Sequence, residues 1–385
     1  MPADKGRFDI FRSTLCRYYL NKTCQTHRNK LYYFLFSFLS IVFSVPTVNA
    51  QTQLWQTNAS GNDIHVFDVD TQQLIKHLIV GPEPHGIAAP ENADVVYVSI
   101  EHKWEPQGEL LWINPLTFQI THRIKVGKEP QAIATTPDGQ WIYVPCRDGY
   151  YWVIDGFKKK VVKKIYTGSR PHNTRASVDG QFMYLSAMGE HQVSIVSIKQ
   201  GHEIVATLPF SNSVRPPALL KNQMYFFQHV DGLVGFEVAH IPSQTNVARV
   251  QHSESLGLYT GINRLGWLDL DGFHRCHGLD IRPSQTEIWS TCGHHLFIHS
   301  LNELNINQVI KKGKENKQPT FPQTGHIILK NDGYWLTFSP DDRFAFIALK
   351  DSDEVMMIDT STKKNVSYFK VGNTPKRNLL IEVHE

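Results

Sequence analysis

The sequence lacks the short motifs that mark the best-defined catalytic and cofactor-binding sites. It contains no G-x-S-x-G nucleophile elbow, no H-E-x-x-H zinc motif, no P-loop and no EF-hand loop. It also contains no C-x-x-C or C-x-x-C-H, the signatures of thioredoxin-like redox sites and of covalent haem attachment. These absences exclude several well-defined enzyme classes, so the function has to be argued from the fold.

Net charge is small and unevenly distributed. The formal net charge is +3, but residues 1–50 alone carry seven Lys or Arg against two acidic residues. The rest of the chain is therefore close to neutral and gives no electrostatic reason to expect a nucleic-acid partner. With 41% hydrophobic residues the chain can build a large core, which excludes a wholly disordered protein.

No apolar run reaches the roughly 20 residues that a membrane-spanning helix needs. The longest, Leu31–Val45, follows two basic residues and precedes a small-residue cleavage site at Ala50. This order is typical of a secretory signal peptide, so residues 1–50 are predicted to be removed. An uncleaved anchor is the alternative, because the stretch ahead of the run is long for a signal peptide. In either case residues 51–385 are expected to be periplasmic or secreted, with no membrane span of their own.

After residue 50 the sequence repeats itself. Gly81, Gly127 and Gly168 occupy the same position in three repeats and lie 46 and 41 residues apart. Each repeat contains short runs of alternating apolar residues, rich in Val, Ile, Tyr and Phe, which are typical of β-strands. Pro137–Gly139 and Val178–Gly180 are typical of tight turns. Four antiparallel strands in about 40 to 50 residues predict the blade of a β-propeller.

Counting the repeats predicts seven blades. Six full repeats begin near the following residues: Pro84, Pro130, Pro171, Arg215, Cys276 and Gly333. Residues 54–80 supply three strands without a first one, and Arg377–Val383 supplies a first strand without its partners. Together they complete a seventh blade, which closes the ring and leaves no open sheet edge. Residues 51–385 are therefore predicted to form one all-β domain, a seven-bladed β-propeller, with long insertions at Ser255–Arg275 and Lys314–Gly325.

The pattern V-G-x-x-P-x-x-I-A-x-x-P-D-G-x-x-x-Y-V, clearest in Val126–Val144 and again in Ser339–Asn378, resembles the repeat of YVTN-type seven-bladed propellers. The resemblance covers nearly all of residues 51–385. Relatives include surface-layer and periplasmic propellers, and the fold is shared by lactonases, streptogramin lyases and haem-bearing nitrite reductase domains. The resemblance therefore implies the architecture and does not select one chemistry.

One position in each repeat is a candidate for the central channel, because the first strand of a propeller blade lines it. This position is a histidine in three repeats. The candidate ligand-binding residues at and beside it are His85, Gln131, His172, Asn173, Arg215, His277, Tyr334, Trp335, Lys376 and Arg377. Their donors suit a carboxylate or phosphate, and their rings offer an apolar wall. The alternative is that they hold water and satisfy backbone groups at the strand ends.

Binding of a divalent metal by the three histidines is a more specific hypothesis, but the sequence supports it less well than anion binding. Neutral imidazoles bind zinc, copper or iron. These three, however, belong to the first, third and fifth blades, and the channel positions include no carboxylate. We expect no cofactor and assign no metal ligand. A second set of polar residues lies after the second strands and includes Glu101, His229 and His295. These side chains could surround the same opening of the channel.

Three cysteines follow residue 50, and two of them are predicted to form a disulfide. In the predicted hairpin, pairing Ile281 with Glu287 places Cys276 opposite Cys292. Opposite residues in an antiparallel pair are about 4.5–5.5 Å apart, within the range that a disulfide accepts. An exported protein meets the redox condition. The third cysteine, Cys146, is predicted to remain a free thiol.

We therefore expect an exported, monomeric binding or scaffold protein whose polar funnel takes a small anionic molecule or a protein of the cell envelope. Two alternatives stay open. One is a propeller enzyme of the lyase or lactonase type, in which a channel histidine acts as general base with a divalent ion. His85 and His277 are the candidates, although the sequence shows no carboxylate beside either. The other alternative is a purely structural surface protein.

Overall fold

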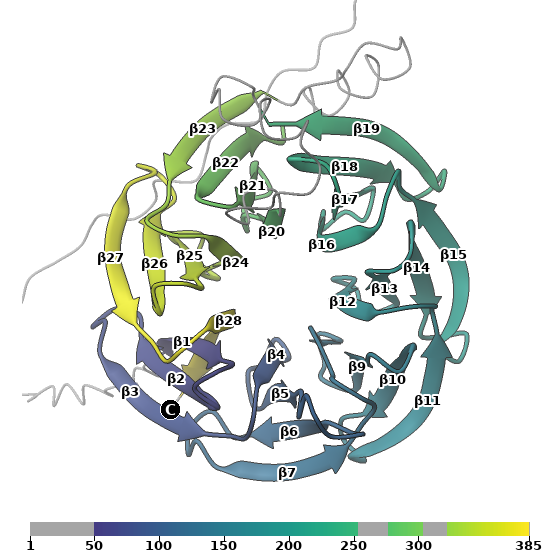
Figure 1. Ribbon diagram of the computed structural model, residues 1–385, viewed down its shortest axis with the longest axis horizontal. Coiled ribbons are helices and arrows are strands. Elements are labelled where there is room, and N and C mark those ends of the chain that lie inside the picture. The colour runs from purple at the N-terminus through teal and green to yellow at the C-terminus, as the bar shows by residue number, and fades with distance from the viewer. Residues whose placement is uncertain (1–49, 253–275, 303–321, 385) are drawn as a thin grey trace, which may run out of the picture. The chain divides into compact units, whose positions relative to one another are not determined.

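The computed structural model describes residues 50–252, 276–302 and 322–384. They form seven four-stranded antiparallel sheets arranged around a central axis, a seven-bladed β-propeller (Figure 1). No helix in these residues is long and apolar enough to cross a membrane. The predicted signal peptide and the insertion at Ser255–Arg275 lie outside the described residues. The second insertion is shorter than predicted, because Gln323–Gly325 pairs with the neighbouring strand and belongs to β23.

Each blade contributes one strand to each of four concentric layers. The innermost strands are β4 (Pro84–Ala88), β8 (Ala134–Thr135), β12 (Pro171–Ala176), β16 (Val214–Leu219), β20 (Cys276–Ile281), β24 (Gly333–Phe338) and β28 (Pro375–His384). The second strands are β1 (Ala50–Asn58), β5 (Val96–Ile100), β9 (Trp141–Pro145), β13 (Phe182–Ala187), β17 (Tyr225–Val230), β21 (Glu287–Cys292) and β25 (Phe344–Leu349).

The third strands are β2 (Asp63–Asp68), β6 (Glu109–Ile113), β10 (Tyr150–Asp155), β14 (Gln192–Ser197), β18 (Gly235–His240), β22 (His295–Ser300) and β26 (Glu354–Asp359). The outermost strands are β3 (Leu74–Ile79), β7 (Ile120–Lys125), β11 (Lys160–Tyr166), β15 (Glu203–Pro209), β19 (Thr245–Gln251), β23 (Gln323–Ile328) and β27 (Asn365–Lys370). Blades one to six are numbered from β4–β7 to β24–β27, and blade seven is β28 with β1–β3.

The seventh blade closes the ring as predicted. Strand β28 pairs with β1 over a long register that runs from Ala50 opposite His384 to Asn58 opposite Pro375. The first and last strands of the propeller, β1 and β28, therefore belong to one sheet, and every innermost strand is hydrogen-bonded to a second strand. Because β28 is the innermost strand of this blade, the C-terminal residues also line the channel.

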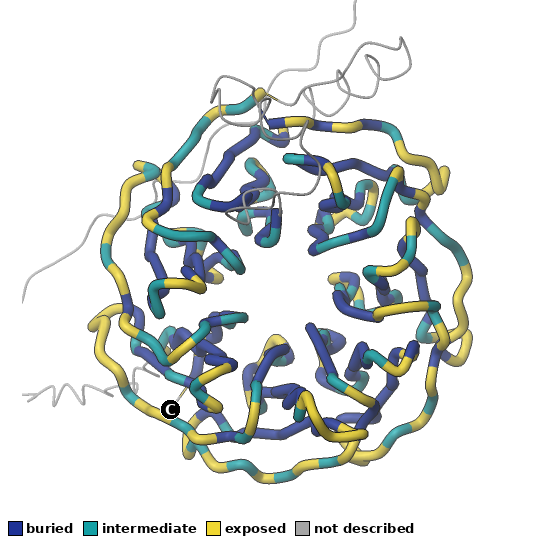
Figure 2. Tube along the Cα trace, in the orientation of Figure 1, coloured by how far each residue is buried: buried dark blue, intermediate teal, exposed yellow. Residues whose placement is uncertain are grey.

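Burial explains why the middle strands are so uniformly apolar. The second and third strands are packed on both faces against neighbouring blades, and strands such as β5 (VYVSI) and β6 (ELLWI) are buried along their whole length. The outermost strands alternate instead, with one side chain half-buried and the next exposed, as in β7. Figure 2 shows this change from a buried interior to an exposed circumference. The alternating runs in the sequence therefore mark the rim, and the continuous runs mark the core.

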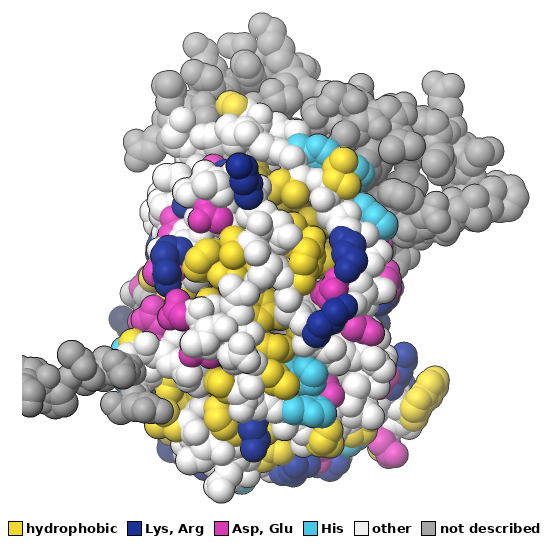
Figure 3. All heavy atoms as spheres, turned by 90° about the vertical axis from the view of Figure 1, so that its left-hand side faces the viewer, with side chains coloured by type: hydrophobic (Ala, Val, Ile, Leu, Met, Phe, Trp, Pro, Cys, Tyr) yellow, Lys and Arg dark blue, Asp and Glu magenta, His cyan; other side chains and the backbone are white. Residues whose placement is uncertain are grey.

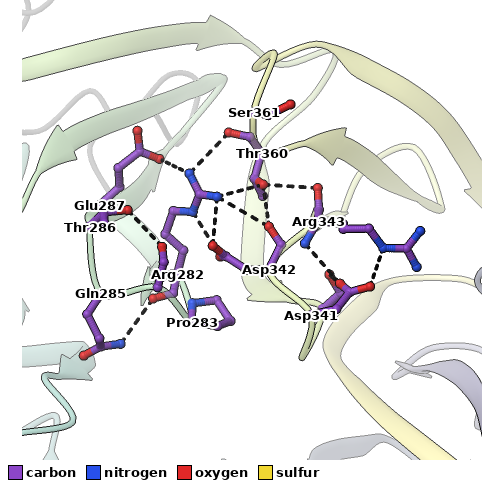
Figure 4. A network of polar contacts seen from close by, with 12 residues as sticks. Arg282, Pro283, Gln285, Thr286, Glu287, Asp341, Asp342, Arg343, Thr360 and Ser361 are labelled. Atoms are coloured by element: carbon purple, nitrogen blue, oxygen red, sulfur yellow. Dashed lines mark hydrogen bonds and ion pairs between the residues drawn. The ribbon is translucent and has the colours of Figure 1, made fainter. Parts of the chain in front are cut away.

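Two blades are tied together by an arginine clamp. Arg282, in the turn after β20, donates hydrogen bonds to Asp342 of blade six at 3.0 and 2.9 Å and to Glu287 at 3.1 Å (Figure 4). It also donates to the hydroxyl of Thr360 at 3.0 Å. These contacts lie at the turns of the blades, so they connect blades five and six without entering the channel.

Cys276 and Cys292 face each other and are joined by a disulfide, the same pair that the sequence analysis joins. The rest of that hairpin corrects the predicted register. Ile281 pairs with Ile288, one residue further along than predicted. His277 is an extra, bulged residue between the two registers, so the cysteines still meet. Cys146 is a buried free thiol.

Candidate functional site

The predicted channel positions share a structural feature that spacing alone did not reveal. In six blades the innermost strand carries a β-bulge at this position, where one extra residue opposes the second strand. The residues inside or beside these bulges are His85, His172, Arg215, His277, Tyr334, Lys376 and Arg377. A bulge bends the strand and redirects its side chain. The bulges therefore give these side chains a direction that a regular strand would not.

His85 is oriented by a carboxylate. Its Nδ1 contacts Glu101 Oε1, and the ammonium group of Lys376 lies 3.3 Å from the same oxygen. Its ring also meets the His172 ring edge to face, with the centroids 5.6 Å apart. Burial lowers the pKa of His85 well below its ordinary value, and the positive charges of Lys376 and Arg377 lower it further. The expectation that no carboxylate supports this histidine is wrong, because Glu101 lies on the adjacent strand end.

His277 is held from the opposite side of the ring of blades. Its Nδ1 donates to the backbone carbonyl of Tyr334 at 2.8 Å, and its ring stacks on the Tyr334 ring with centroids 3.8 Å apart. Burial lowers the pKa of His277 well below its ordinary value, and Arg377 adds to this effect. The pKa of His172 is lowered in the same way by burial and by the neighbouring His85 and Arg377. All three imidazoles are therefore neutral at physiological pH.

Arg377 is the centre of the group. Its side chain is buried, with 2% exposed, and its guanidinium carbon lies 3.3 Å from the centre of the Trp335 ring. Its Nη2 donates to Asn173 Oδ1 at 3.2 Å. No Asp or Glu among the described residues forms an ion pair with it. Burial lowers the pKa of Arg377 to about 9, so it still carries its charge at neutral pH.

Gln131 and Arg215 form hydrogen bonds with residues outside this group. Gln131 is buried and donates to the backbone carbonyl of Glu129 at 2.9 Å. Arg215 forms an ion pair with Asp231, in which Nη2 donates to Oδ2 at 2.8 Å. Both therefore have partners within the protein and offer less to a ligand than Arg377 does.

A cavity of about 290 Å³ lies in the channel beside this group. Asn173, Trp335 and Arg377 line it directly, whereas the three histidines are not part of its wall. The rest of the wall comes from several blades and is mixed, with the polar residues Thr135, Thr174, Arg175, Asp280, Thr337 and Asn378 beside apolar ones. The apolar lining residues are Ile87, Ala88, Ala89, Ala132, Ile133, Ala134, Ala176, Pro217 and Leu379. The cavity therefore combines charged side chains with patches of apolar wall.

Two lining residues were missed from the sequence. Arg175 Nη2 donates to Asp280 Oδ1 at 3.1 Å across the channel, and its Nε donates to the carbonyl of Pro217 at 3.1 Å. Burial raises the pKa of Asp280, although the Arg175 charge opposes this. The expectation of a channel without carboxylates is therefore wrong. The two-residue periodicity of a strand could have identified Arg175, because it lies two residues after Asn173 and therefore on the same face of the strand.

Several buried polar atoms in and near the channel have no hydrogen-bond partner within the part of the chain that the structure describes. They include Nε and Nη1 of Arg377, Nδ2 of Asn173, Nε2 of His85, Nδ1 of His172 and Oδ1 of Asn378. Unpaired buried polar atoms are costly and rare in native proteins, so each one calls for an explanation. Three of these atoms, Nε and Nη1 of Arg377 and Nδ2 of Asn173, are hydrogen-bond donors, and they belong to two side chains that line the cavity. The group as a whole is suited to an acceptor that carries negative charge.

His85, His172 and His277 are not close enough to one another to form a shared set of three metal ligands. Among the described residues, two groups have three ligand atoms within 4.8 Å of one another. One is His229 with the two disulfide-bonded cysteines, and the other is Asp63 with His65 and His77 in blade seven. Neither lies among the bulge residues of the channel.

Comparison with known proteins supports the fold and no more. No protein-family profile and no curated protein matches this sequence. Among solved structures, hydrazine synthase of Kuenenia stuttgartiensis aligns with a TM-score of 0.65 at 18% identity, over 80% of this chain and 92% of that one. The periplasmic gluconolactonase PpgL of Pseudomonas aeruginosa aligns with a TM-score of 0.66 at 12% identity, over 86% and 99%.

The dihydro-heme d1 dehydrogenase NirN aligns with a TM-score of 0.55 at 12% identity, over 85% of this chain and 74% of that one. These proteins carry out different chemistries on a similar propeller. At such low identity the likeness extends to the architecture alone, and the channel residues have to be interpreted from their own geometry.

Proposed function

We propose that this protein is an exported, non-catalytic propeller of the YVTN-repeat type that binds a small carboxylate in its central channel. The observation that carries the proposal is the buried guanidinium of Arg377, which has no carboxylate partner among the described residues. A buried charge is costly unless it is paired. A bound carboxylate would supply the missing partner.

The neighbours of Arg377 favour an anion over a cation or a neutral ligand. Burial lowers the pKa of Arg377, and the positive charge of Arg175 lowers it further, so a second cation acts on this part of the channel. Asp280 is paired with Arg175 and therefore does not neutralise Arg377. Asn173 is already turned toward Arg377, so its free Nδ2 can donate to the same ligand.

The shape of the cavity favours a carboxylate that carries a short apolar group. A volume of about 290 Å³ is at the low end for small-molecule pockets. A free phosphate would leave the wall formed by Ile87, Ile133 and Leu379 without contact. A carboxylate with a few carbon atoms would place its charge at Arg377 and its apolar part against this wall.

The proposal can be tested by thermal shift and calorimetry with a panel of small monocarboxylates, dicarboxylates and inorganic phosphate. A binder should raise the melting temperature, since ligand at about 100 times its Kd stabilises the folded state by about 2.7 kcal/mol. Arg377→Met should abolish that shift. Arg123→Met, on the outer strand β7, removes the same charge from an exposed site and should leave the shift intact. A shift that survives Arg377→Met, or no shift with any anion, would contradict the proposal.

A second candidate function rests on His85. The Glu101 carboxylate orients its Nδ1, and its Nε2 has no hydrogen-bond partner among the described residues, so Nε2 of the neutral ring is available to accept a proton. This is the arrangement of a general base oriented by a carboxylate. A lactone or ester substrate would have to be turned over by the wild type and lost with both His85→Gln and Glu101→Gln. Turnover that is unchanged in both variants would exclude His85 as the base.

Export is supported by the apolar segment Leu31–Val45 and by the disulfide, which requires an oxidising compartment to persist. We propose that the mature protein begins after Ala50 and acts as a monomer. N-terminal sequencing of the protein from the cell envelope or medium, with sedimentation of the same sample, tests both statements. A chain that retains residues 1–50 would instead indicate an anchor.

A further inference from the structure

A second site lies far from the channel, on the outer part of blade seven. His65 on β2 and His77 on β3 are directly opposite each other in the strand register. Asp63 lies two residues before His65 and therefore on the same face of β2. The three side chains form a tripod on one side of a two-stranded ribbon. Figure 3 looks onto the flank where β3 runs and shows histidine side chains beside acidic ones low on this face.

The ligand atoms of the tripod converge on one point. Nε2 of His77 lies 2.8 Å from Asp63 Oδ2, and Nε2 of His65 lies 3.8 Å from the same oxygen. The two imidazole rings have centroids 4.6 Å apart. Ligands at about 2.0–2.1 Å from a tetrahedral zinc ion are roughly 3.3 Å from one another. The observed separations lie on both sides of that value, so small side-chain rotations would suffice.

The Asp63 carboxylate is held firmly in place. Asn58 Nδ2 donates to its other oxygen, Oδ1, at 2.8 Å. Its surroundings also leave it little room, because a β-carbon on Gly61 or on Gly372 would come within 2.8 or 2.6 Å of Oδ1. Such support of a ligand from behind is typical of metal sites, where it fixes the orientation of the coordinating atom.

The partners of the Asp63 carboxylate are an amide and two histidines. No Lys or Arg among the described residues forms an ion pair with this carboxylate, and its polar neighbours are the two imidazoles and Asn58. Exposure increases along the tripod, from 9% for the Asp63 side chain to 15% for His65 and 48% for His77. An ion could therefore enter from the solvent side and keep water in its remaining positions.

We propose that Asp63, His65 and His77 form a binding site for a divalent transition metal of the zinc type. Two imidazoles and one carboxylate suit Zn²⁺, Ni²⁺ and Cu²⁺ and are a poor set for Ca²⁺ or Mg²⁺, which prefer oxygen ligands alone. The site is separate from the channel, so it does not depend on the anion proposal. Its three residues come from one ribbon, so it also does not depend on ring closure.

Calorimetric titration of the chelator-treated full chain with ZnCl₂ tests the proposal. One equivalent should bind to the wild type, and His77→Ala should weaken that equivalent by about tenfold or more, in line with the cost of disturbing metal-site residues. Asp63→Asn should weaken it as well. His122→Ala, a half-buried histidine on the outer strand of blade one, is the matched control and should bind as the wild type does.

Two further measurements keep the result interpretable. Each variant should melt like the wild type in the absence of metal, since His77 is half-exposed on an edge strand. Co²⁺ bound to the wild type should give the visible absorption of a low-coordinate site, and His77→Ala should lose it. Equal zinc affinity in the wild type, His77→Ala and Asp63→Asn would overturn the proposal, as would an equal loss in the His122→Ala control. Arg377→Met should leave zinc binding unchanged.

Discussion

Two arginines of this propeller, the half-buried Arg282 and the buried Arg377, have very different surroundings. Arg282, in the clamp between blades five and six, is surrounded by the acceptors Asp342, Glu287 and Thr360 (Figure 4). Arg377, in the channel, contacts an aromatic ring and one amide oxygen, and no carboxylate of residues 50–252, 276–302 or 322–384 pairs with it. Burial alone would lower the pKa of both. Hydrogen bonds to Asp342 and Glu287 reverse the effect for Arg282 and raise its pKa, whereas the pKa of Arg377 falls to about 9.

The difference separates a stabilising arginine from one that is available to a ligand. The charge of Arg282 is paired within the protein, so its loss would leave the Asp342 carboxylate without an ion-pair partner. The channel leaves charge and hydrogen-bonding capacity unused at the centre of the molecule, which costs stability. Natural proteins accept such a cost at functional sites. The following predictions test this contrast, from the largest expected effect to the smallest.

Removing the strand that carries Arg377 should be far more damaging than changing Arg377 itself. Deletion of residues 375–385 removes β28, exposes the edge of β1 and opens the ring. We expect loss of cooperative unfolding and aggregation, followed by circular dichroism and light scattering during heating. If the truncated protein melts like the full chain, the ring is not held by this strand, and the position of Arg377 in the channel needs another explanation.

Acid should destabilise the histidine-rich interior before it affects the clamp. The folded-state pKa values of His85, His172 and His277 are lowered, so the unfolded chain binds more protons below about pH 6.5. The free energy of unfolding should therefore have its full value above that pH. As the pH decreases below it, this free energy should fall by up to about 1.4 kcal/mol per pH unit for each such histidine.

The clamp should keep its charges over the same range. Burial would raise the pKa of Glu287, but hydrogen bonds from Lys363, Trp289 and Arg282 lower it overall. Urea unfolding between about pH 7.5 and pH 5 measures the difference. A stability that stays constant over this interval would contradict the assignment of neutral, buried imidazoles.

Arg282→Met should destabilise the protein by about 2–3 kcal/mol, because it leaves Asp342 without its ion-pair partner and removes one of the three donors to Glu287. Arg282→Lys should recover only part of the loss, since an ammonium group cannot reproduce the planar fork that contacts both carboxylates. Urea unfolding of the three proteins gives these values. Equal stability of the wild type and Arg282→Met would show that the clamp contributes nothing measurable.

Arg377→Met should change stability least, with a result between no effect and a gain of about 1 kcal/mol. Removing an unpaired buried charge relieves its desolvation cost, and a methionine can still pack on the Trp335 ring. The same urea experiment provides the measurement, in a buffer without carboxylates. A loss as large as that of Arg282→Met would mean that Arg377 is a structural residue, and the contrast between the two arginines would fail.

The architecture could be predicted from the sequence because every repeat carries the same strand pattern. The blade count, the closing strand and the order of strands follow from repeated patterns, so an error in one repeat is corrected by the others. The irregular features were harder to predict. The hairpin that carries the disulfide contains a bulge at His277, and a bulge shifts the register by one residue without leaving a signal in the apolar alternation.

The channel was predictable in its positions but not in its pairings. The repeat placed His85, His277 and Lys376 at equivalent strand starts, with Arg377 beside Lys376, and all of them lie at bulges in the structure. The contact between His85 and Glu101 depends on where one strand ends beside another, and the ion pair between Arg175 and Asp280 crosses the channel between blades three and five. Such contacts arise from ring geometry, and one repeat unit does not contain them.

The most direct test of the channel as an anion site is a crystal structure of the protein grown in sodium bromide, with anomalous data collected at the bromine edge. The account predicts a bromide ion within hydrogen-bonding distance of Arg377 and of the free amide nitrogen of Asn173, and no such ion in Arg377→Met. A channel in which ordered water pairs every one of these atoms, with bromide bound only elsewhere, would contradict it.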